Sequence, residues 1–184
     1  MKDVPLPATA FADARTRMLL ANDGSTTRLL ESVLRGPLTV IVEKQVEEDA
    51  AGLPRPVREA LRLDRRETVV TRRSLLVTAD HRPVSRNLVV IADESLHRLV
   101  ADRTVPLGLA LVSAGVEQRR TTLAIGRCSW PQAGPYRLAA VKTYLIATGG
   151  HPRLHLREIY NPDLFPAHLH PAYTAEAGFR AAVI

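Results

Sequence analysis

The sequence predicts an α+β fold with a single antiparallel sheet of about six strands. Segments rich in β-branched residues come mostly in pairs joined by short turns, which is typical of antiparallel hairpins. Helical segments occur in separate blocks instead of alternating with single strands, so a parallel βαβ arrangement is not expected. No internal repeat or long linker divides the chain, and residues 1–184 are therefore expected to form one domain.

The helices are predicted from the spacing of their apolar residues and from the residues that flank them. Asn22-Asp23-Gly24 breaks the first helix, and Ser25 caps the second. Asp93 caps a helix that runs through Leu99 and Val100, and a later helix opens with a proline, which suits a first helical turn. The predicted helices are 8–21, 26–34, 54–63 (a short helix or turn), 93–100 and 106–114.

The strands are predicted from runs of aliphatic and β-branched residues bounded by turn residues. One hairpin turns at 79–82, and another turns at Gly149-Gly150, a strong turn signal. The acidic stretch 47–52, the Pro/Gly loop 130–135 and the tail 162–184 are expected to be irregular. The predicted strands are 38–46, 67–78, 83–92, 120–129, 139–148 and 153–160.

Composition excludes several classes of protein. The single cysteine, Cys128, rules out an internal disulfide and favours a reducing compartment; it is expected to fill a small core site rather than to act as a nucleophile. The first residues lack the apolar region of a signal peptide, and no run of about 18 apolar residues could span a membrane. We therefore expect a cytoplasmic protein without membrane contact.

The charge balance is basic, with a net charge of +6 and an isoelectric point near 10.1. Such values are common in nucleic-acid-binding proteins. However, only three of the 25 basic residues are lysines, the arginines are spread among acids, and no helix-turn-helix, zinc-finger or RNA-binding signature occurs. We therefore expect no nucleic-acid partner. A small anionic ligand suits this composition better, because guanidinium groups bind anions in bidentate fashion.

Motifs for nucleotide binding or nucleophilic catalysis are absent, including GxxxxGK, GxGxxG and GxSxG. The histidines between 151 and 170 lack the spacing of a metal site, so no metal is expected. Two arginine pairs, Arg72-Arg73 and Arg119-Arg120, are interpreted as solvated strand ends. One member of each pair must nevertheless face the opposite side of its strand.

Two predicted strands each carry one charge on an otherwise apolar face. Side chains alternate along a strand, so Arg86 shares a face with Val84, Leu88 and Val90. In the same way, Glu158 shares a face with Leu154, Leu156 and Tyr160. A buried unpaired charge is costly, so each needs a partner or a ligand. Two interpretations stay open: a structural ion pair between strands, or a pocket in which Arg86 holds an anion and Glu158 holds or moves a proton.

A further set of segments is informative through its order and spacing along the chain. They are Gly24-Ser25-Thr26-Thr27-Arg28-Leu29-Leu30-Glu31 followed by 38–45, then 84–90, Val105-Pro106-Leu107-Gly108, 144–150, Pro152 and Arg157-Glu158-Ile159-Tyr160. In this order and spacing they resemble the chorismate pyruvate-lyase family over about residues 20–161. The hairpin before Arg86 is about two residues shorter than in the family's ubiquinone-pathway enzymes, which leaves the face of Arg86 unchanged. The tail after Phe165 has no counterpart in the family.

The resemblance implies a cofactor-free lyase that removes pyruvate from chorismate and leaves 4-hydroxybenzoate. It implies a six-stranded antiparallel sheet with helices packed on one side, and a ligand pocket closed by helical flaps. Arg86 would hold the ring carboxylate through charge-assisted hydrogen bonds, and Glu158, near the 4-hydroxyl, would help remove a proton. The other substrate-binding residues would be Thr27, Arg28, Leu107 and Gly108. For Thr27 and Arg28, a helix-start and surface role fits equally well.

Two alternatives to the lyase stay open. The same fold resembles the effector-sensing domains of some transcription regulators, which would make the chain a small-molecule-sensing binding module. The lack of an appended DNA-binding segment counts against a regulator, and a proton-handling Glu158 favours a lyase. The fold would also suit a biosynthetic enzyme that acts on another ring substrate. The sequence does not predict the oligomeric state.

Overall fold

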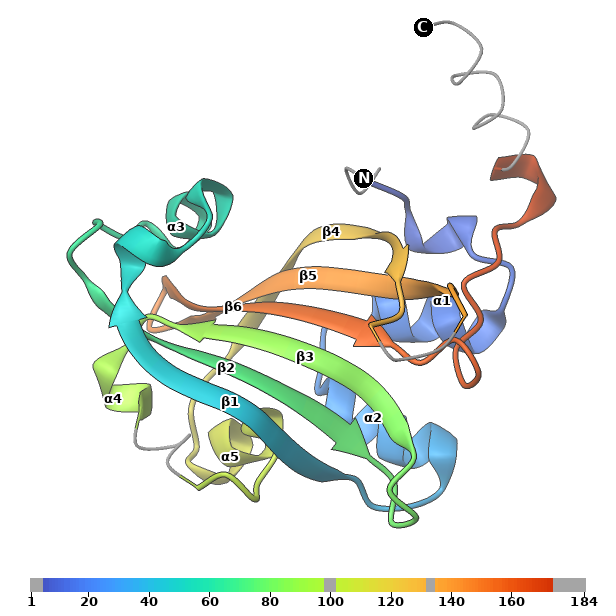
Figure 1. Ribbon diagram of the computed structural model, residues 1–184, viewed down its shortest axis with the longest axis horizontal. Helices are drawn as coiled ribbons and strands as arrows, with labels where there is room; N and C mark the ends of the chain where they lie inside the picture. Colours follow the sequence, from blue (N-terminus) through green and yellow to red (C-terminus); the bar gives the residue numbers. More distant parts are fainter. Residues whose placement is uncertain (1–4, 98–101, 132–134, 174–184) are drawn as a thin grey trace, which may run out of the picture.

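The protein is built around one open sheet of six antiparallel strands (Figure 1), seen in a computed structural model that describes residues 5–97, 102–131 and 135–173. The strand order is β1-β2-β3-β6-β5-β4. The strands are β1 (Thr39–Asp49), β2 (Thr68–Val77), β3 (Pro83–Ile91), β4 (Arg119–Ser129), β5 (Leu138–Thr148) and β6 (His151–Tyr160). Two three-stranded meanders, β1–β3 and β4–β6, therefore meet where β3 pairs with β6. The predicted α+β class with a single antiparallel sheet is confirmed.

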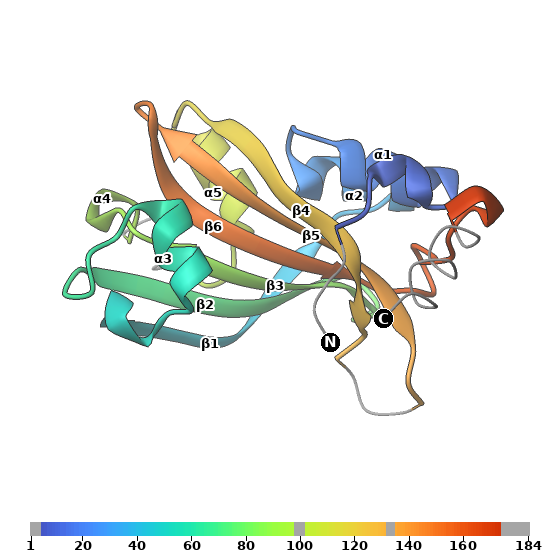
Figure 2. The ribbon, with the colours of Figure 1, turned by 90° about the horizontal axis from the view of Figure 1, so that it is seen from above.

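Helices pack mainly on one face of the sheet, as predicted (Figures 1 and 2). The helices are α1 (Ala14–Ala21), α2 (Thr26–Leu34), α3 (Arg55–Leu61), α4 (Glu94–His97) and α5 (Leu107–Ser113). On the covered face, Leu30 of α2 and Leu111 of α5 are fully buried within the two main apolar clusters. Helix α3 lies on the opposite face, where Leu61 packs near Val69 and Val90. The predicted continuation of α4 through Leu99 and Val100 lies outside the described residues.

The N-terminal helix is shorter than the sequence predicts. In place of a continuous helix over 8–21, the structure has a 3₁₀ turn at Ala8–Ala10 and then α1. Asp13 sets the start of α1, because its carboxylate accepts the backbone N–H of Thr16 at 2.8 Å and so caps the helix. Phe11, fully buried, is extended and pairs with Leu169 from the tail.

The described part of the tail, residues 162–173, contributes to the core. Phe165 is 1% exposed and contacts Tyr160 edge to face, with 6.1 Å between the ring centroids. The backbone N–H of Ala12 donates to the carbonyl of His168 at 2.9 Å. Residues 162–170 contain no regular helix or strand, residues 171–173 are helical, and the segment packs against the N-terminal segment.

Strand β1 runs through part of the predicted acidic loop 47–52 and ends at Asp49. Glu47, Glu48 and Asp49 continue the pairing with β2, opposite Val70, Val69 and Thr68. These acids lie on an edge strand, where charged side chains are solvated and oppose pairing with another sheet. Extending β1 through these acids therefore does not require a charged side chain to be buried.

Within the described residues, no helix has the length and apolar character needed to cross a membrane. The same part of the chain contains no group of three His, Cys, Asp or Glu side chains arranged to hold a metal ion.

His155 is a buried titratable group on the face that α3 covers. It is 8% exposed, lies opposite Val90 and Leu145 in the neighbouring strands, and its Nδ1 atom has no hydrogen-bond partner among the described residues. Burial lowers the pKa of this imidazole below its usual value. The unfolded chain therefore takes up a proton at this residue more readily than the folded protein does.

We expect this difference in pKa to make stability fall as the pH drops from about 7 through the usual histidine range, and to level off below the lowered pKa. His155→Leu cannot be protonated and should flatten that part of the curve. Urea unfolding between about pH 7.5 and 5 measures the effect. His151→Leu, at an exposed position of the same strand, is the control. An H155L curve parallel to that of the wild type would contradict the assignment.

Candidate functional site

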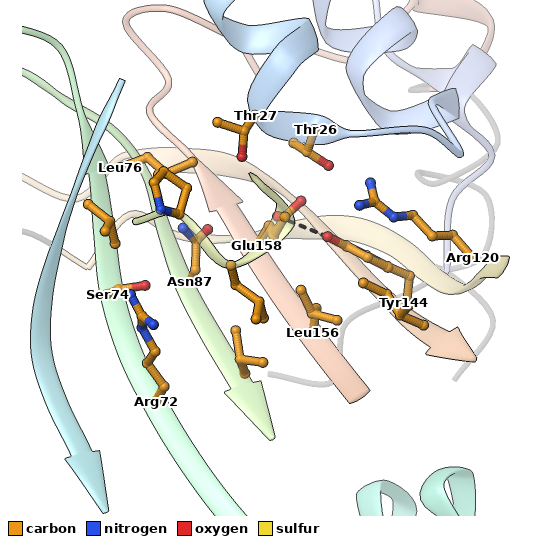
Figure 3. A pocket seen from close by; sticks show the side chains of 16 residues that line it. Thr26, Thr27, Arg72, Ser74, Leu76, Asn87, Arg120, Tyr144, Leu156 and Glu158 are labelled. Carbon is orange, nitrogen blue, oxygen red and sulfur yellow. Dashed lines mark hydrogen bonds between the residues drawn. The ribbon is translucent and has the colours of Figure 1, made fainter. Parts of the chain in front are cut away.

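A small cavity of about 40 Å³ lies between the covered face of the sheet and the first turns of α2 and α5 (Figure 3). Strands β2 and β3 of one meander and β4, β5 and β6 of the other supply side chains to it, so the cavity straddles the junction between the two halves of the sheet. Thr26 and Thr27 line it from α2, and Pro106, Leu107 and Gly108 from the start of α5. A space of this size holds a few water molecules.

Arg72 is the most deeply buried cation of this cavity. It shares the covered face of β2 with Ser74 and Leu76, because every second residue of a strand faces the same side. Only 1% of its surface is exposed. Its Nη2 atom is 3.5 Å from the carbonyl oxygen of Val105, and its Nη1 atom has no hydrogen-bond partner among the described residues. Burial, helped by nearby Arg103, lowers the pKa of this guanidinium. The Asp102 carboxylate opposes this shift from a distance, but no carboxylate of the described chain forms an ion pair with Arg72.

Arg120 from β4 lies at the opposite side of the cavity (Figure 3). Its Nη2 atom donates to the Gln118 side chain at 3.2 Å, its Nη1 atom is buried without a partner in the described part of the chain, and its guanidinium lies 5.8 Å from the ring centre of Tyr144. A Cβ at Gly108 would lie 3.7 Å from Thr27 Oγ1 and 3.8 Å from Arg120 Nη2. These are ordinary van der Waals distances, so α5 lies against both α2 and the arginine at this glycine.

Glu158 on β6 is the carboxylate of the cavity, and it is 6% exposed. The hydroxyl of Tyr144 donates to Oε1 at 3.0 Å, and the hydroxyl of Tyr160 donates to Oε2 at 2.6 Å. Burial and the adjacent carboxylate raise the pKa of both tyrosines well above the usual value, so both remain donors. Each carboxylate oxygen therefore has one fixed donor.

The electrostatics of the cavity favour an anion. Two guanidiniums and one carboxylate line it, and the carboxylate is already satisfied by two hydroxyl groups. The first turn of α2 adds the partial positive charge of a helix N-terminus, because the Ser25 side chain caps only the N–H of Arg28. Asn87 adds an Oδ1 atom that is buried without a partner among the described residues.

The structure brings together four of the six site residues that the sequence predicts. Glu158, Thr27, Leu107 and Gly108 line the cavity. Arg28 does not, because its side chain is exposed on α2, which agrees with the surface role that the sequence left open for it.

Arg86, the other predicted residue, lies on the opposite face of the sheet. Asn87, not Arg86, is directly opposite Glu158 across the β3–β6 pair, and directly opposite residues share a face. Arg86 is about one-third exposed, and its Nη2 atom is 2.6 Å from Glu43 Oε1. The prediction that Arg86 and Glu158 face one pocket is therefore wrong. Both faces of β3 carry aliphatic side chains, so the pattern of apolar residues does not identify the cavity face.

The polar cavity residues that sequence reasoning did not select are Thr26, Arg72, Ser74, Asn87, Arg120 and Tyr144. The consecutive arginines were the available signal. Strand alternation requires Arg72 and Arg73 to face opposite sides, and likewise Arg119 and Arg120. One arginine of each pair is thus directed toward the covered face, where helices exclude water.

Comparison with known proteins finds similarity at the level of the fold. No protein-family model matches the chain, and no curated protein sequence matches it significantly. The solved ligand-binding domain of a GntR-family transcriptional regulator from Bordetella bronchiseptica matches with 23% identity and a TM-score of 0.53, over 72% of this chain and 88% of that one. The effector domain of PhnF from Mycobacterium smegmatis matches with 15% identity and a TM-score of 0.62, over 76% and 90%.

A third similar structure is the C-terminal domain of a histidine utilization repressor from Pseudomonas syringae, at 15% identity and a TM-score of 0.56, over 71% of this chain and 94% of that one. The fold shared with these regulator domains is also that of chorismate lyase, which the sequence resemblance implied.

The prediction of a lyase that cleaves chorismate to 4-hydroxybenzoate is wrong. The similar structures are regulator domains described as ligand-binding, effector or C-terminal domains, and none of the three is described as an enzyme. The substrate arginine on which the lyase prediction depended, Arg86, lies outside the cavity and is bound to Glu43. The sensing alternative agrees with these findings.

We expect Tyr160→Phe to destabilise the fold by about 1–3 kcal/mol, because it leaves one oxygen of a buried carboxylate without its hydroxyl donor. Urea unfolding at neutral pH measures the change. Tyr136→Phe removes the same group from a side chain that is 66% exposed, and should change stability by less than about 0.5 kcal/mol. Equal stability of the two variants would contradict the role given to the Tyr160–Glu158 hydrogen bond.

Proposed function

We propose that this chain is a small-molecule-sensing domain whose ligand is a small organic anion with two acidic groups, bound between Arg72 and Arg120. The observation that carries the proposal is the fully buried guanidinium of Arg72, which forms no ion pair in the described chain and has Nη1 without a hydrogen-bond partner there, although Asp102 acts on it at longer range. The regulator domains with the same fold include ones described as ligand-binding and effector domains, which supports a binding role for this chain.

The energetics of Arg72 support an anionic ligand. Burying a charge without a partner is strongly unfavourable, so such a residue destabilises the ligand-free protein. A ligand carboxylate, phosphate or sulfate would restore the missing partner through charge-assisted hydrogen bonds to the guanidinium. The unfavourable free energy of burying the Arg72 charge is then present only in the ligand-free protein. Binding of an anion would remove it, which favours the bound state.

The second acidic group of the ligand is proposed from Arg120. Its Nη1 atom is buried without a partner among the described residues, and the first turn of α2 lies beside it. Arg72 and Arg120 come from different halves of the sheet and face the cavity from opposite sides (Figure 3). One anionic group cannot satisfy two separated guanidiniums as well as two groups can, so a diacid fits better than a monoacid.

Glu158 has a different role in this proposal. Its two oxygens are held by tyrosine hydroxyls, yet each carboxylate oxygen can accept a further hydrogen bond. A hydroxyl or ammonium group in the middle of the ligand would provide that donor. The carboxylate would also repel an acidic group placed there, which restricts the acids of the ligand to the two arginines.

Ligand entry requires α2 and α5 to separate. The cavity of about 40 Å³ is smaller than an organic diacid, while typical ligand pockets measure roughly 300 Å³ or more. Helix α5 has only seven residues, and at Gly108 it lies against Thr27 of α2. These helices therefore act as the flap over the site, and its opening and closing couples ligand binding to a change of shape.

Arg72→Met tests the proposal, because it should affect binding and stability in opposite directions. Succinate, glutarate and inorganic sulfate are the probes, measured by isothermal titration calorimetry. Affinity for the best diacid should fall by at least about tenfold in R72M and in Arg120→Met. The free domain should become more stable in R72M, on the order of 1 kcal/mol, because a buried unpaired charge is replaced by an apolar side chain.

Arg86→Met is the matched control, since the same change on the opposite face of the sheet should leave affinity within about twofold. Binding that is equally weakened by R86M, or R72M with lower stability than the wild type, would contradict the proposal. So would the failure of the wild type to bind any of the three probes at millimolar concentration.

A further inference from the structure

Lys142 is a buried cation behind the cavity that the proposed function does not use. It lies on β5 with 3% of its surface exposed, and it does not line the cavity. It is directly opposite Glu158 in the β5–β6 pair. Its ammonium group lies 5.5 Å from the ring centre of Tyr144, on which Arg120 also rests. A lysine is almost never buried to this extent without specific partners.

Among the described residues, a hydrogen bond from the ammonium group joins two segments distant in sequence. Nζ donates to the backbone carbonyl of Asn22, the residue that ends α1. Asn22 also forms the turn before α2, because its side chain accepts the N–H of Gly24 at 3.1 Å and donates to the Gly24 carbonyl at 3.2 Å. Lys142 therefore fixes a turn that is itself internally rigid.

This turn positions the upper wall of the cavity. Ser25 follows it as the N-cap of α2, and Thr26 and Thr27 come next and line the cavity. On the sheet side, Lys142 lies beside Glu158, which lines the cavity from below. Lys142, which is opposite Glu158 in the strand pair and interacts with it electrostatically, is thus hydrogen-bonded to Asn22, three residues before the N-cap of α2.

We propose that Lys142 is a positioning residue that fixes the α1–α2 turn to the sheet, so that an anion bound on the sheet also orders the first turn of α2. The inference rests on the proposed function for its ligand, but the contact between Lys142 and the turn is testable without one. A hydrogen bond from a buried ammonium group is directional and strong, and an apolar side chain of the same length could not replace it.

Hydrogen exchange is the direct test, with inorganic sulfate as the probe. In Lys142→Met without sulfate, amides of residues 22–28 should exchange at least about tenfold faster than in the wild type, while β5 and β6 keep their protection. In the wild type, sulfate should slow exchange over 22–28; in K142M, it should bind about tenfold more weakly and leave this segment fast. Lys44→Met, an exposed lysine on β1, should behave like the wild type.

A pH series separates positioning from a purely structural role. The charged and titratable groups that face Lys142 are Glu158 on β6, Arg120 on β4, Tyr144 on β5 and Asp23 in the turn. Burial lowers the pKa of Lys142, although Glu158 opposes this shift. Lys142 should therefore lose its charge below the usual lysine range as the pH rises, and sulfate affinity should fall with it. Sulfate itself does not titrate there, and Lys142→Arg, which stays charged, should remove this pH dependence and restore protection of 22–28.

The outcomes distinguish this inference from the proposed function. Unchanged exchange of residues 22–28 in K142M overturns the inference, whether or not sulfate binds. A wild type that does not bind sulfate, with a turn that is nevertheless released in K142M, overturns the anion site but keeps the positioning role. Faster exchange throughout the sheet in K142M, with no recovery in K142R, overturns the inference in favour of a general packing role.

Discussion

The cost of keeping a guanidinium away from water is the constraint on which this site depends. Arg72 faces the covered side of the sheet, where α2 and α5 exclude solvent, and it forms no ion pair within the described chain. Two other buried charged groups do have hydrogen-bond partners. Glu158 accepts hydrogen bonds from two tyrosine hydroxyls, and Lys142 donates to a backbone carbonyl. The unsatisfied charge is thus concentrated at the arginines.

Strand alternation determines which charges enter the cavity. Arg72 and Asn87 face the covered side, whereas their neighbours Arg73 and Arg86 face the other, so a shift of one residue would exchange the two sets. A register shift near Glu43 in β1 occurs at the point where this carboxylate meets Arg86. On the face opposite the cavity, Arg86 is partly exposed and forms an ion pair with Glu43. On the covered face, Arg72 forms no ion pair within the described chain.

Much of the fold could be predicted from the sequence, because turn residues and runs of β-branched side chains are local signals. Gly149-Gly150 identified one hairpin, and Ser25 identified the start of α2. The cavity was harder to predict because both faces of β3 are apolar: Val90 packs under α3 and Val89 under the other helices. Which face forms the site is decided by the positions of helices distant in sequence. The pairing of Phe11 with Leu169 depends on tertiary contact in the same way.

The junction between the two meanders has a further consequence for how the domain assembles. Each meander is formed by strands that are neighbours in sequence, whereas the β3–β6 contact joins Ser85 to Tyr160 and must close a long loop. The cavity lies across this contact, with Arg72 on one side and Arg120 on the other. A ligand that bridges them acts as a non-covalent crosslink between two folding units. It would slow their separation under mechanical load, and nascent chains would complete their last, slowest pairing more efficiently in its presence.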